Sequence, residues 1–317
     1  MTITQLQYVL AVAEHKNFTA AAEKCFVTQP TLSMQIQKLE EELGVQIFDR
    51  SKKPIALTDV GEKIVDQAKS IVNESDRIKD IVDQQKGFIG GDFKLGIIPT
   101  VTPTLLPMFM ANFVKKYPKV NLIVEERPTE EIIRMLKNGQ LDAAIAATPL
   151  EEETIKEVVL YYEPFVAYVP ENYPGHEKKE FEIEDLEVNL GNLLLLQDGH
   201  CFRNNVLNIC KAGNLNNTNH FSIECGSFET MVKLADEGLG MTLLPYLHTL
   251  DLHEKAKQKL RHFKAPQPSR EVSLIYNKKE LKVHIIDALR ATISGVIRGA
   301  IAFQDVQIIS CLLYTSP

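Results

Sequence analysis

Apolar positions in the first 58 residues recur at helical spacing and then give way to a short alternating pattern. The first predicted helix carries its apolar face on Leu6, Val9, Leu10 and Ala13. The Ala-rich run 19–25 predicts a second, short helix that packs closely against its neighbours. A third helix is predicted to begin after Thr28, a suitable N-cap, with Pro30 in its first turn.

The second and third predicted helices, joined by a short turn, form a helix-turn-helix whose later helix enters the major groove of DNA. Glutamine can bond adenine, while hydroxyl groups and lysine can meet bases or phosphates. The residues predicted to contact DNA on this segment are Thr28, Gln29, Pro30, Thr31, Ser33, Gln37 and Lys38. Taken alone, this polar face is equally typical of a solvated surface helix.

A basic hairpin is predicted directly after the third helix. Gly44 suits a helix stop, a short strand runs to Arg50, and Pro54 turns the chain into a second strand over 55–57. The hairpin carries Arg50, Lys52 and Lys53, which we expect to contact phosphates. This placement favours a winged helix-turn-helix over residues 1–58.

A long helix with one apolar seam is predicted from Thr58, its N-cap, to about Gln85. The seam alternates spacings of four and three, as in a coiled coil, through Ile64, Ala68, Ile71, Ser75, Ile78 and Val82. One helix cannot bury such a seam alone, so residues 59–88 are predicted to dimerise the chain and to end in a Gly-rich hinge.

Strands and helices alternate from residue 89 to residue 302. Predicted strands span 93–98, 120–124, 141–146, 158–169, 193–196, 221–224, 241–244 and 270–276. Predicted helices span 105–116, 130–137, the segments after Gly199 and Gly226, and 282–301. The alternation predicts mainly parallel α/β sheet in two lobes, 89–163 with 269–302 and 164–268, with a ligand cleft between them. Residues 303–317 continue past the closing helix as a tail with no evident partner, so we treat this tail as possibly not native.

Bulk composition narrows the class of protein. No apolar run in the 317 residues approaches the ~18 that a membrane span needs. The first residues lack the basic and apolar regions of a secretory signal, so we expect a cytoplasmic protein with reduced thiols and no membrane partner. The net charge of −7 argues against nonspecific coating of nucleic acid but allows a sequence-specific binder.

The chain has five cysteines: Cys25, Cys201, Cys210, Cys225 and Cys311. They form no C-x-x-C pair and meet no histidine at zinc spacing, so neither a metal site nor a cofactor is expected. An isolated cytosolic cysteine is usually a small buried hydrophobe, the interpretation we give Cys25 and Cys225. Cys201 differs because it begins a predicted helix beside His200 and Arg203, where partial and full positive charges favour a thiolate.

From residue 1 to about residue 302, this order of parts resembles the LysR-type transcriptional regulators. The resemblance rests on the segments 18–22, 28–33, 39–40, 43–44, 57–58 and 238–245, together with Ile36 and Gly61. It implies a winged helix-turn-helix, a long coiled-coil linker helix and a two-lobed, periplasmic-binding-protein-like α/β regulatory domain. It also implies a homotetramer built from dimers and bound to promoter DNA.

Within that family, residues 198–203 with Cys210, and residues 98–101 with Thr129, are similar to the members that sense hydrogen peroxide. By that similarity, Cys201 is the peroxidatic cysteine and Cys210 the resolving one. The same similarity gives a peroxide pocket of Thr100, Thr129, His200 and Arg270. Because about nine helical steps separate two such cysteines by ~13–14 Å, and a disulfide needs less than ~7 Å, pairing them requires the segment to unwind.

These patterns together predict a DNA-binding regulator of oxidative-stress genes, not an enzyme, that senses peroxide through a reversible Cys201–Cys210 disulfide. Its expected partners are promoter DNA, a second copy of itself, hydrogen peroxide, RNA polymerase and a thiol reductant. One alternative is a regulator that binds a small organic effector in the cleft and has structural cysteines. Another is a solute-binding protein or thiol peroxidase that shares the two-lobed fold, although the helix-turn-helix argues against a solute binder.

Overall fold

The structure of the protein is a computed structural model that describes residues 1–85, 89–210, 225–301 and 306–310. The chain divides into two compact units, residues 1–88 with 138–140, and residues 89–137 with 141–317. Among the described residues, no helix is long and apolar enough to cross a membrane. The predicted strand 221–224, the glycine at position 87 and the cysteine at position 311 lie outside the described residues.

The first unit begins with three helices whose ends are set by local side chains. They are α1 (Ile3–His15), α2 (Phe18–Lys24) and α3 (Gln29–Leu43). Thr28 caps α3 by accepting a hydrogen bond from the Thr31 amide, and Gly44 ends it in the left-handed region at φ 69°. The cap and the stop predicted for the third helix are therefore confirmed.

The predicted hairpin is present as β1 (Phe48–Asp49) and β2 (Ala56–Leu57), paired antiparallel. Helix α4 (Asp59–Gln85) follows, and Thr58 accepts a hydrogen bond from the Gly61 amide at its start. A side chain at Gly61 would place its Cβ 2.1 Å from the carbonyl oxygen of Ile47. Glycine at this position lets α4 begin tightly against the hairpin.

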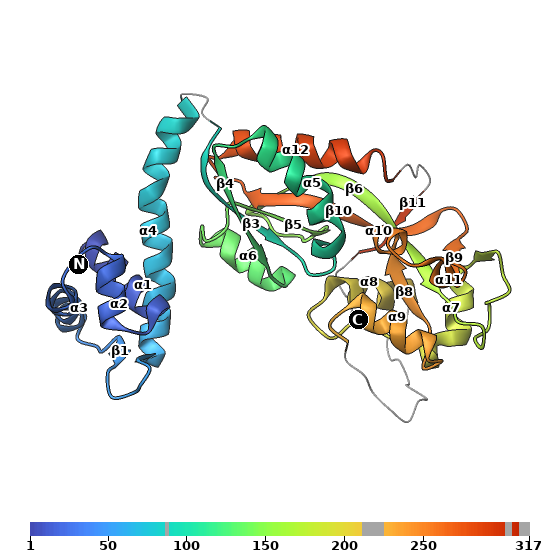
Figure 1. Cartoon of the computed structure of the whole chain (residues 1–317), viewed down its shortest axis with the longest axis horizontal. Coiled ribbons are helices and arrows are strands. Elements are labelled where there is room, and N and C mark those ends of the chain that lie inside the picture. Colours follow the sequence, from blue (N-terminus) through green and yellow to red (C-terminus); the bar gives the residue numbers. More distant parts are fainter. Residues whose placement is uncertain (86–88, 211–224, 302–305, 311–317) are drawn as a thin grey trace. The chain divides into compact units, whose positions relative to one another are not determined.

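Lobe I of the second unit is a mixed sheet with helices on both faces (Figure 1). Strands β3 (Gly91–Ile97), β4 (Val120–Glu126) and β5 (Ala143–Thr148) are parallel. Beside β5, the long strands β10 (Gln267–Asn277) and β6 (Ile155–Tyr168) run antiparallel to their neighbours. Helices α5 (Thr102–Lys116) and α12 (Val283–Ile297) cover one face and α6 (Thr129–Lys137) the other. The prediction of a mainly parallel sheet is wrong, because β6 and β10 cross between the lobes as an antiparallel pair.

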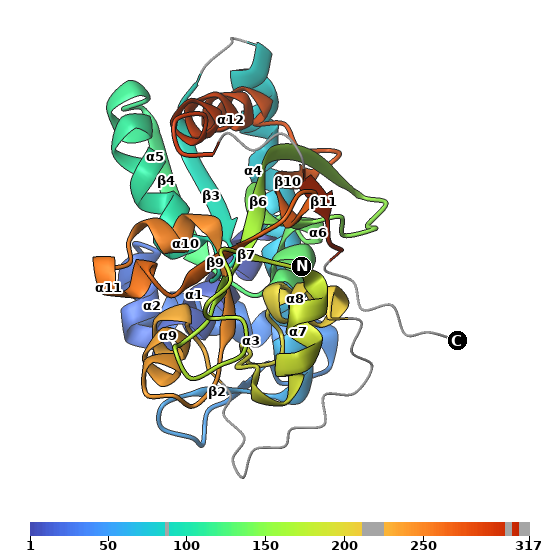
Figure 2. The same ribbon diagram turned by 90° about the vertical axis from the view of Figure 1, so that its right-hand side faces the viewer.

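Lobe II is built on the far half of β6 (Figure 2). There β6 pairs with β8 (Thr242–Pro245) and β9 (Leu260–Phe263), and β9 pairs with β7 (Glu180–Phe181). The helical elements of this lobe are α7 (Ile183–Asn189), the 3-10 turn η1 (Leu190–Asn192), α8 (Cys201–Ile209), α9 (Phe228–Asp236), α10 (Tyr246–Leu250) and α11 (Glu254–Lys257). The predicted strand 193–196 is only two isolated bridges, Leu193 to Met241 and Leu196 to Cys225, so its apolar run fills the core without forming a ladder.

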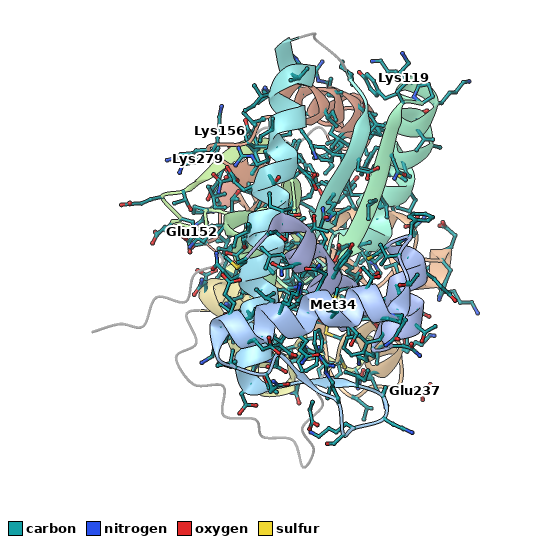
Figure 3. All side chains as sticks on the ribbon, turned by 90° about the vertical axis from the view of Figure 1, so that its left-hand side faces the viewer. Met34, Lys119, Glu152, Lys156, Glu237 and Lys279 are labelled. Atoms are coloured by element: carbon teal, nitrogen blue, oxygen red, sulfur yellow. The ribbon has the colours of Figure 1, made fainter. Side chains whose placement is uncertain are left out.

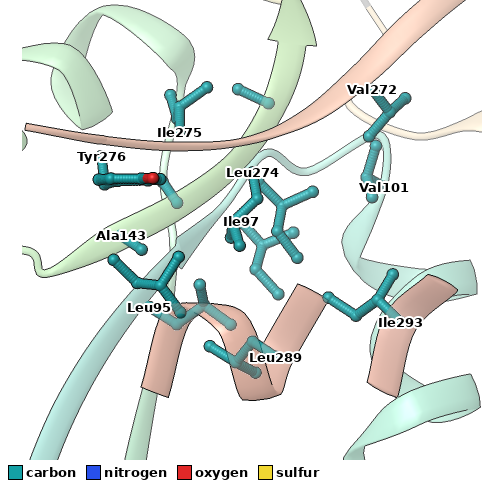
Figure 4. Close-up of a cluster of buried hydrophobic side chains, with 14 of the residues drawn as sticks. Leu95, Ile97, Val101, Ala143, Val272, Leu274, Ile275, Tyr276, Leu289 and Ile293 are labelled. Carbon is teal, nitrogen blue, oxygen red and sulfur yellow. The ribbon is translucent and has the colours of Figure 1, made fainter. Parts of the chain in front are cut away.

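Each lobe encloses its own apolar core. Figure 4 shows the lobe I cluster, in which Leu95, Ile97 and Leu274 from the sheet meet Leu289 and Ile293 of α12. The strand residues alternate faces, so both faces of the sheet are covered. The two cores are joined by the paired strands β6 and β10.

The chain after α12 departs from two expectations. Helix α12 ends at Ile297, earlier than predicted, since the next residues turn back on the Ile297 carbonyl. The tail was predicted to lack a partner, but β11 (Val306–Ile308) pairs in parallel with β10 and Ile309 is buried in the lobe II core. A strand of three residues is too short to show an alternating pattern, so the sequence did not predict this pairing.

Candidate functional site

The predicted DNA-contacting face of α3 lies on the surface of the first unit. Thr28, Gln29, Pro30, Thr31, Gln37 and Lys38 are exposed and Ser33 is half-buried. The Thr28 and Thr31 hydroxyls lie 2.8 Å apart, so both belong to the cap of α3 as well as to its surface. Met34, labelled in Figure 3, is 49% exposed on the same helix and adds an apolar group that we did not predict.

Of the three cationic side chains of the basic hairpin, one is held by an ion pair to α3 and two are exposed. Arg50 forms a 2.9 Å ion pair with the buried carboxylate of Glu40 and lies 5.0 Å above the Phe18 ring. The same carboxylate accepts the amides of Ile47 and Phe48. Arg50 thus fixes the hairpin to α3, whereas Lys52 and Lys53 are exposed at its tip, with Lys52 only 3.8 Å from Asp49.

The apolar seam of α4 has two different environments. Ile64, Ala68 and Ile71 pack on the core of the helix-turn-helix. Towards the other end, Ile78, Ile81 and Val82 are 65%, 49% and 47% exposed. The seam that needs a partner is therefore its C-terminal half.

Two helix starts from different lobes meet at Cys201. Cys201 is the first residue of α8 in lobe II, Thr129 is the first residue of α6 in lobe I, and the Cys201 Sγ lies 2.9 Å from the Thr129 Oγ1. Helix starts carry partial positive charge, and the Cys201 sulfur lies at the start of one helix and beside the start of another.

The charged residues beside Cys201 in the sequence have interactions of their own. Arg203 forms a 2.8 Å ion pair with Asp198 and donates to the Leu196 carbonyl. Burial lowers the pKa of His200, with Glu126 opposing this, so the imidazole is held towards its neutral form.

Arg270 and Thr100 form a buried network next to this site. The Arg270 Nη1 donates to the Thr100 Oγ1 at 2.9 Å and its Nη2 to the Thr100 carbonyl at 3.1 Å. The guanidinium carbon lies 5.4 Å from the centre of the Phe202 ring, the residue after Cys201. The structure therefore joins Thr129 to Cys201 directly, and links Thr100 and Arg270 to α8 through Phe202.

Glu163 completes the network and was not predicted. Its Oε2 accepts from the Nε and Nη2 of Arg270 at 2.9 and 2.7 Å, and its Oε1 accepts the Leu247 amide at 2.9 Å. Both charged side chains are 1% exposed. A lone carboxylate inside an otherwise apolar strand was the available sequence signal, since a charge at such a position needs a buried partner.

The described cysteines, Cys25, Cys201, Cys210 and Cys225, are thiols without a disulfide. Cys210 caps the end of α8 and is buried in the lobe II core. Burial raises the pKa of Cys25 and of Cys225, as expected for small hydrophobes. Over the described ranges, His, Cys, Asp and Glu side chains form no cluster of three or more that could hold a metal.

Comparison with known protein families agrees with both units. Residues 3–62 match the model of the bacterial regulatory helix-turn-helix protein of the lysR family, and residues 86–296 match the LysR substrate binding domain. The chain belongs to the LysR family of transcriptional regulators.

Several relatives of this LysR-family chain are named for hydrogen peroxide. It is 34% identical to the hydrogen peroxide-inducible genes activator of Pectobacterium carotovorum subsp. carotovorum, over 87% of this chain and 90% of the relative. It is 33% identical to the DNA-binding transcriptional dual regulator OxyR of Escherichia coli K12, over 93% of this chain and 97% of OxyR.

Solved structures agree. A full-length OxyR from Pseudomonas aeruginosa with a cysteine-to-aspartate substitution is 35% identical, has a TM-score of 0.73 and is matched over 93% of this chain and 98% of that one. A Corynebacterium glutamicum OxyR with a cysteine-to-serine substitution and bound hydrogen peroxide is 28% identical, with a TM-score of 0.63 over 94% of this chain and 93% of that one.

Proposed function

We propose that this LysR-family regulator senses hydrogen peroxide at Cys201 and reports it to its DNA-binding unit through a reversible disulfide with Cys210. The observation that carries the proposal is the position of Cys201, where two helix starts and the Thr129 hydroxyl meet at one sulfur. The OxyR relatives support the choice of oxidant. Thr100, Thr129, His200 and Arg270 form the peroxide pocket in this proposal.

The chemistry needs only the protein and peroxide. The Cys201 thiolate attacks one peroxide oxygen, the O–O bond breaks, and the departing hydroxide takes a proton to become water. Sulfur is thereby oxidised to a sulfenic acid and peroxide is reduced. The Cys210 thiol then displaces the sulfenic oxygen as a second water, forming the S–S bond, and a thiol reductant restores both thiols by exchange.

The disulfide acts as a switch because α8 separates the two residues. Nine steps of helical rise separate the Cα atoms of Cys201 and Cys210 by ~13–14 Å, whereas the two Cα atoms of a disulfide lie less than ~7 Å apart. Forming the disulfide therefore requires α8 to unwind. This helix contacts both lobes, because Cys201 lies against the lobe I core and Cys210 lies within the lobe II core. Oxidation in this way changes how the lobes meet.

The remaining partners follow from the first unit. Gln29, Ser33 and their neighbours on α3, with Lys52 and Lys53, read and hold promoter DNA in the cytoplasm. The exposed end of the α4 seam pairs with a second copy, and two dimers assemble into a tetramer that acts on RNA polymerase. Peroxide is consumed once per switching event, so the protein is a regulator rather than an enzyme.

The test is brief peroxide treatment followed by mass spectrometry and transcription from a target promoter. The wild-type chain should gain a Cys201–Cys210 linked peptide, C210S should accumulate a sulfenic acid at Cys201, and C201S should do neither. C225S is the matched control and should behave as wild type. An unchanged transcriptional response to peroxide in C201S would contradict the proposal and favour an organic effector in the cleft.

A further inference from the structure

A short strand from the end of the chain is fastened to the strand pair that joins the lobes. Residues 306–310 are here called the C-terminal strap, and its residues 306–308 pair in parallel with β10 from Gln267 to Ser269. The Ile309 amide donates to the Ser269 carbonyl at 2.8 Å. The Ile309 side chain is buried in the lobe II core. The backbone bonds that hold the strap to β10 involve no residue of α8, whereas Ile309 shares the lobe II core with α8 side chains.

Two asparagines of α8 hold the other side of the strap. The Asn205 Nδ2 donates to the Ile309 carbonyl at 2.9 Å, and the Asn208 Nδ2 donates to the Ser310 carbonyl at 2.8 Å. They are three residues apart, so both amides leave the same face of the helix. Asn205 is 1% exposed, and its Oδ1 is buried with no hydrogen-bond partner among the described residues.

The hydrogen bond from Asn205 to the strap is the one that offsets the burial of its amide. A buried amide oxygen without a partner costs stability, and leucine would fill an apolar site without this cost. The Asn205 amide retains only its bond to the strap as compensation. Both asparagines also lie between Cys201 and Cys210, within the segment that has to unwind.

We propose that Asn205 and Asn208 are positioning residues that clamp α8 shut against the strap and so set the rate of the disulfide step. Unwinding α8 moves both side-chain amides away from the carbonyls of Ile309 and Ser310, because the strap stays paired with β10. The clamp opposes closure of the disulfide but does not touch the sulfur, so oxidation of Cys201 by peroxide keeps its rate. This inference rests on the proposed function of the two cysteines.

Three asparagines on one helix allow a matched test. In N205A and N208A one bond to the strap is lost, whereas Asn204, half-buried on the same helix, makes no hydrogen bond through its side chain to any described residue. All three changes raise helix propensity equally, so N204A corrects for that effect. N208A is the milder variant, because Asn208 is half-buried whereas Asn205 is 1% exposed.

The two chemical steps are timed separately in the full-length protein. After peroxide, the Cys201–Cys210 disulfide should form about fivefold faster in N205A and in N208A than in N204A, the factor expected for one ordinary hydrogen bond. With C210S added, sulfenic acid formation at Cys201 should be equal in all three. Equal disulfide rates with normal sulfenic acid formation overturn the clamp alone, whereas no sulfenic acid in any of them overturns the proposed function.

Hydrogen exchange of the reduced protein gives a readout that needs no peroxide. The α8 amides should exchange about fivefold faster in N208A than in N204A, because exchange follows local opening. Unchanged α8 exchange in both strap variants overturns the clamp even where the sulfur chemistry is intact.

Discussion

The Cys201 Sγ and the Thr129 Oγ1 lie 2.9 Å apart, each on the first residue of a helix and each in a different lobe. A hydroxyl at this distance can donate to a thiolate, and a hydrogen bond to a charged group contributes about 1.5–3 kcal/mol. The contact couples the reactivity of the thiol to the fit between the lobes.

The variant T129V keeps the shape of the side chain and removes this donor. Sulfenic acid formation at Cys201 should slow by about tenfold or more, the factor that corresponds to such a bond. The rate is measured with limiting peroxide in the C210S background. T292V serves as control, because the Thr292 hydroxyl only bonds to the Ala288 carbonyl within α12. An unaltered rate in T129V contradicts a role for this hydroxyl.

The Glu163–Arg270 pair should dominate the stability of the junction between lobes. E163Q leaves a buried guanidinium without its counter-charge, which typically costs about 3–5 kcal/mol. The free energy of unfolding is measured by urea denaturation. E229Q, at the exposed Lys233–Glu229 pair, should leave the denaturation midpoint unchanged. Equal effects of the two substitutions would argue against a buried ion pair.

Three histidines should make the second unit sensitive to mild acid. Burial lowers the pKa values of His200, His248 and His262 below the ordinary value near 6.5. Between the lowered values and about 6.5 the unfolded chain binds more protons than the folded chain, so stability is complete above this window and is lost as the pH falls through it.

The urea midpoint should therefore decline from pH 7.5 to pH 5.5. H248N should flatten this decline, since it removes one of the three groups. A midpoint that rises on acidification contradicts the assignment of neutral histidines.

The two parts of the DNA-binding surface should respond differently to substitution. K52Q removes one phosphate contact and should lower the slope of log affinity against log salt by about 1. Q29A should keep that slope and lose about 1–3 kcal/mol of discrimination at one base position. Fluorescence anisotropy on a matched set of duplexes measures both. A steep change of slope in Q29A would reverse the assigned roles.

The exposed end of α4 should control assembly. Ile78 is 65% exposed in the single chain, so I78D places a charge in the predicted dimer seam. Light scattering should show dissociation of the I78D protein, while K69D, at an exposed charged residue of the same helix, should remain assembled. Dissociation of neither variant would move the dimer interface elsewhere.

The helix-turn-helix was predictable because its boundaries are local. Thr28 and Gly44 act on residues within one turn, so cap and stop can be recognised in the sequence. The helix between Cys201 and Cys210 has no such side-chain cap or glycine stop, and it was predicted from its position after Gly199. In contrast, Glu163 and Arg270 are 107 residues apart in the sequence. Strand β11 pairs with β10, but its three residues are too few to predict a strand or its partner. The direction of β6 and β10 was missed because alternation of strands and helices gives element order but not strand polarity.

Strands β6 and β10 leave lobe I side by side, with Pro164 paired to Ser269 at the crossing. The segment 165–268 therefore leaves and rejoins lobe I at adjacent strands, and the C-terminal strap adds Ile309 to the lobe II core. An excised 164–268 fragment would carry Cys201 and Cys210 away from Thr100, Thr129 and Arg270. Such a fragment would separate the two cysteines of the proposed disulfide from the lobe I residues of the proposed peroxide pocket.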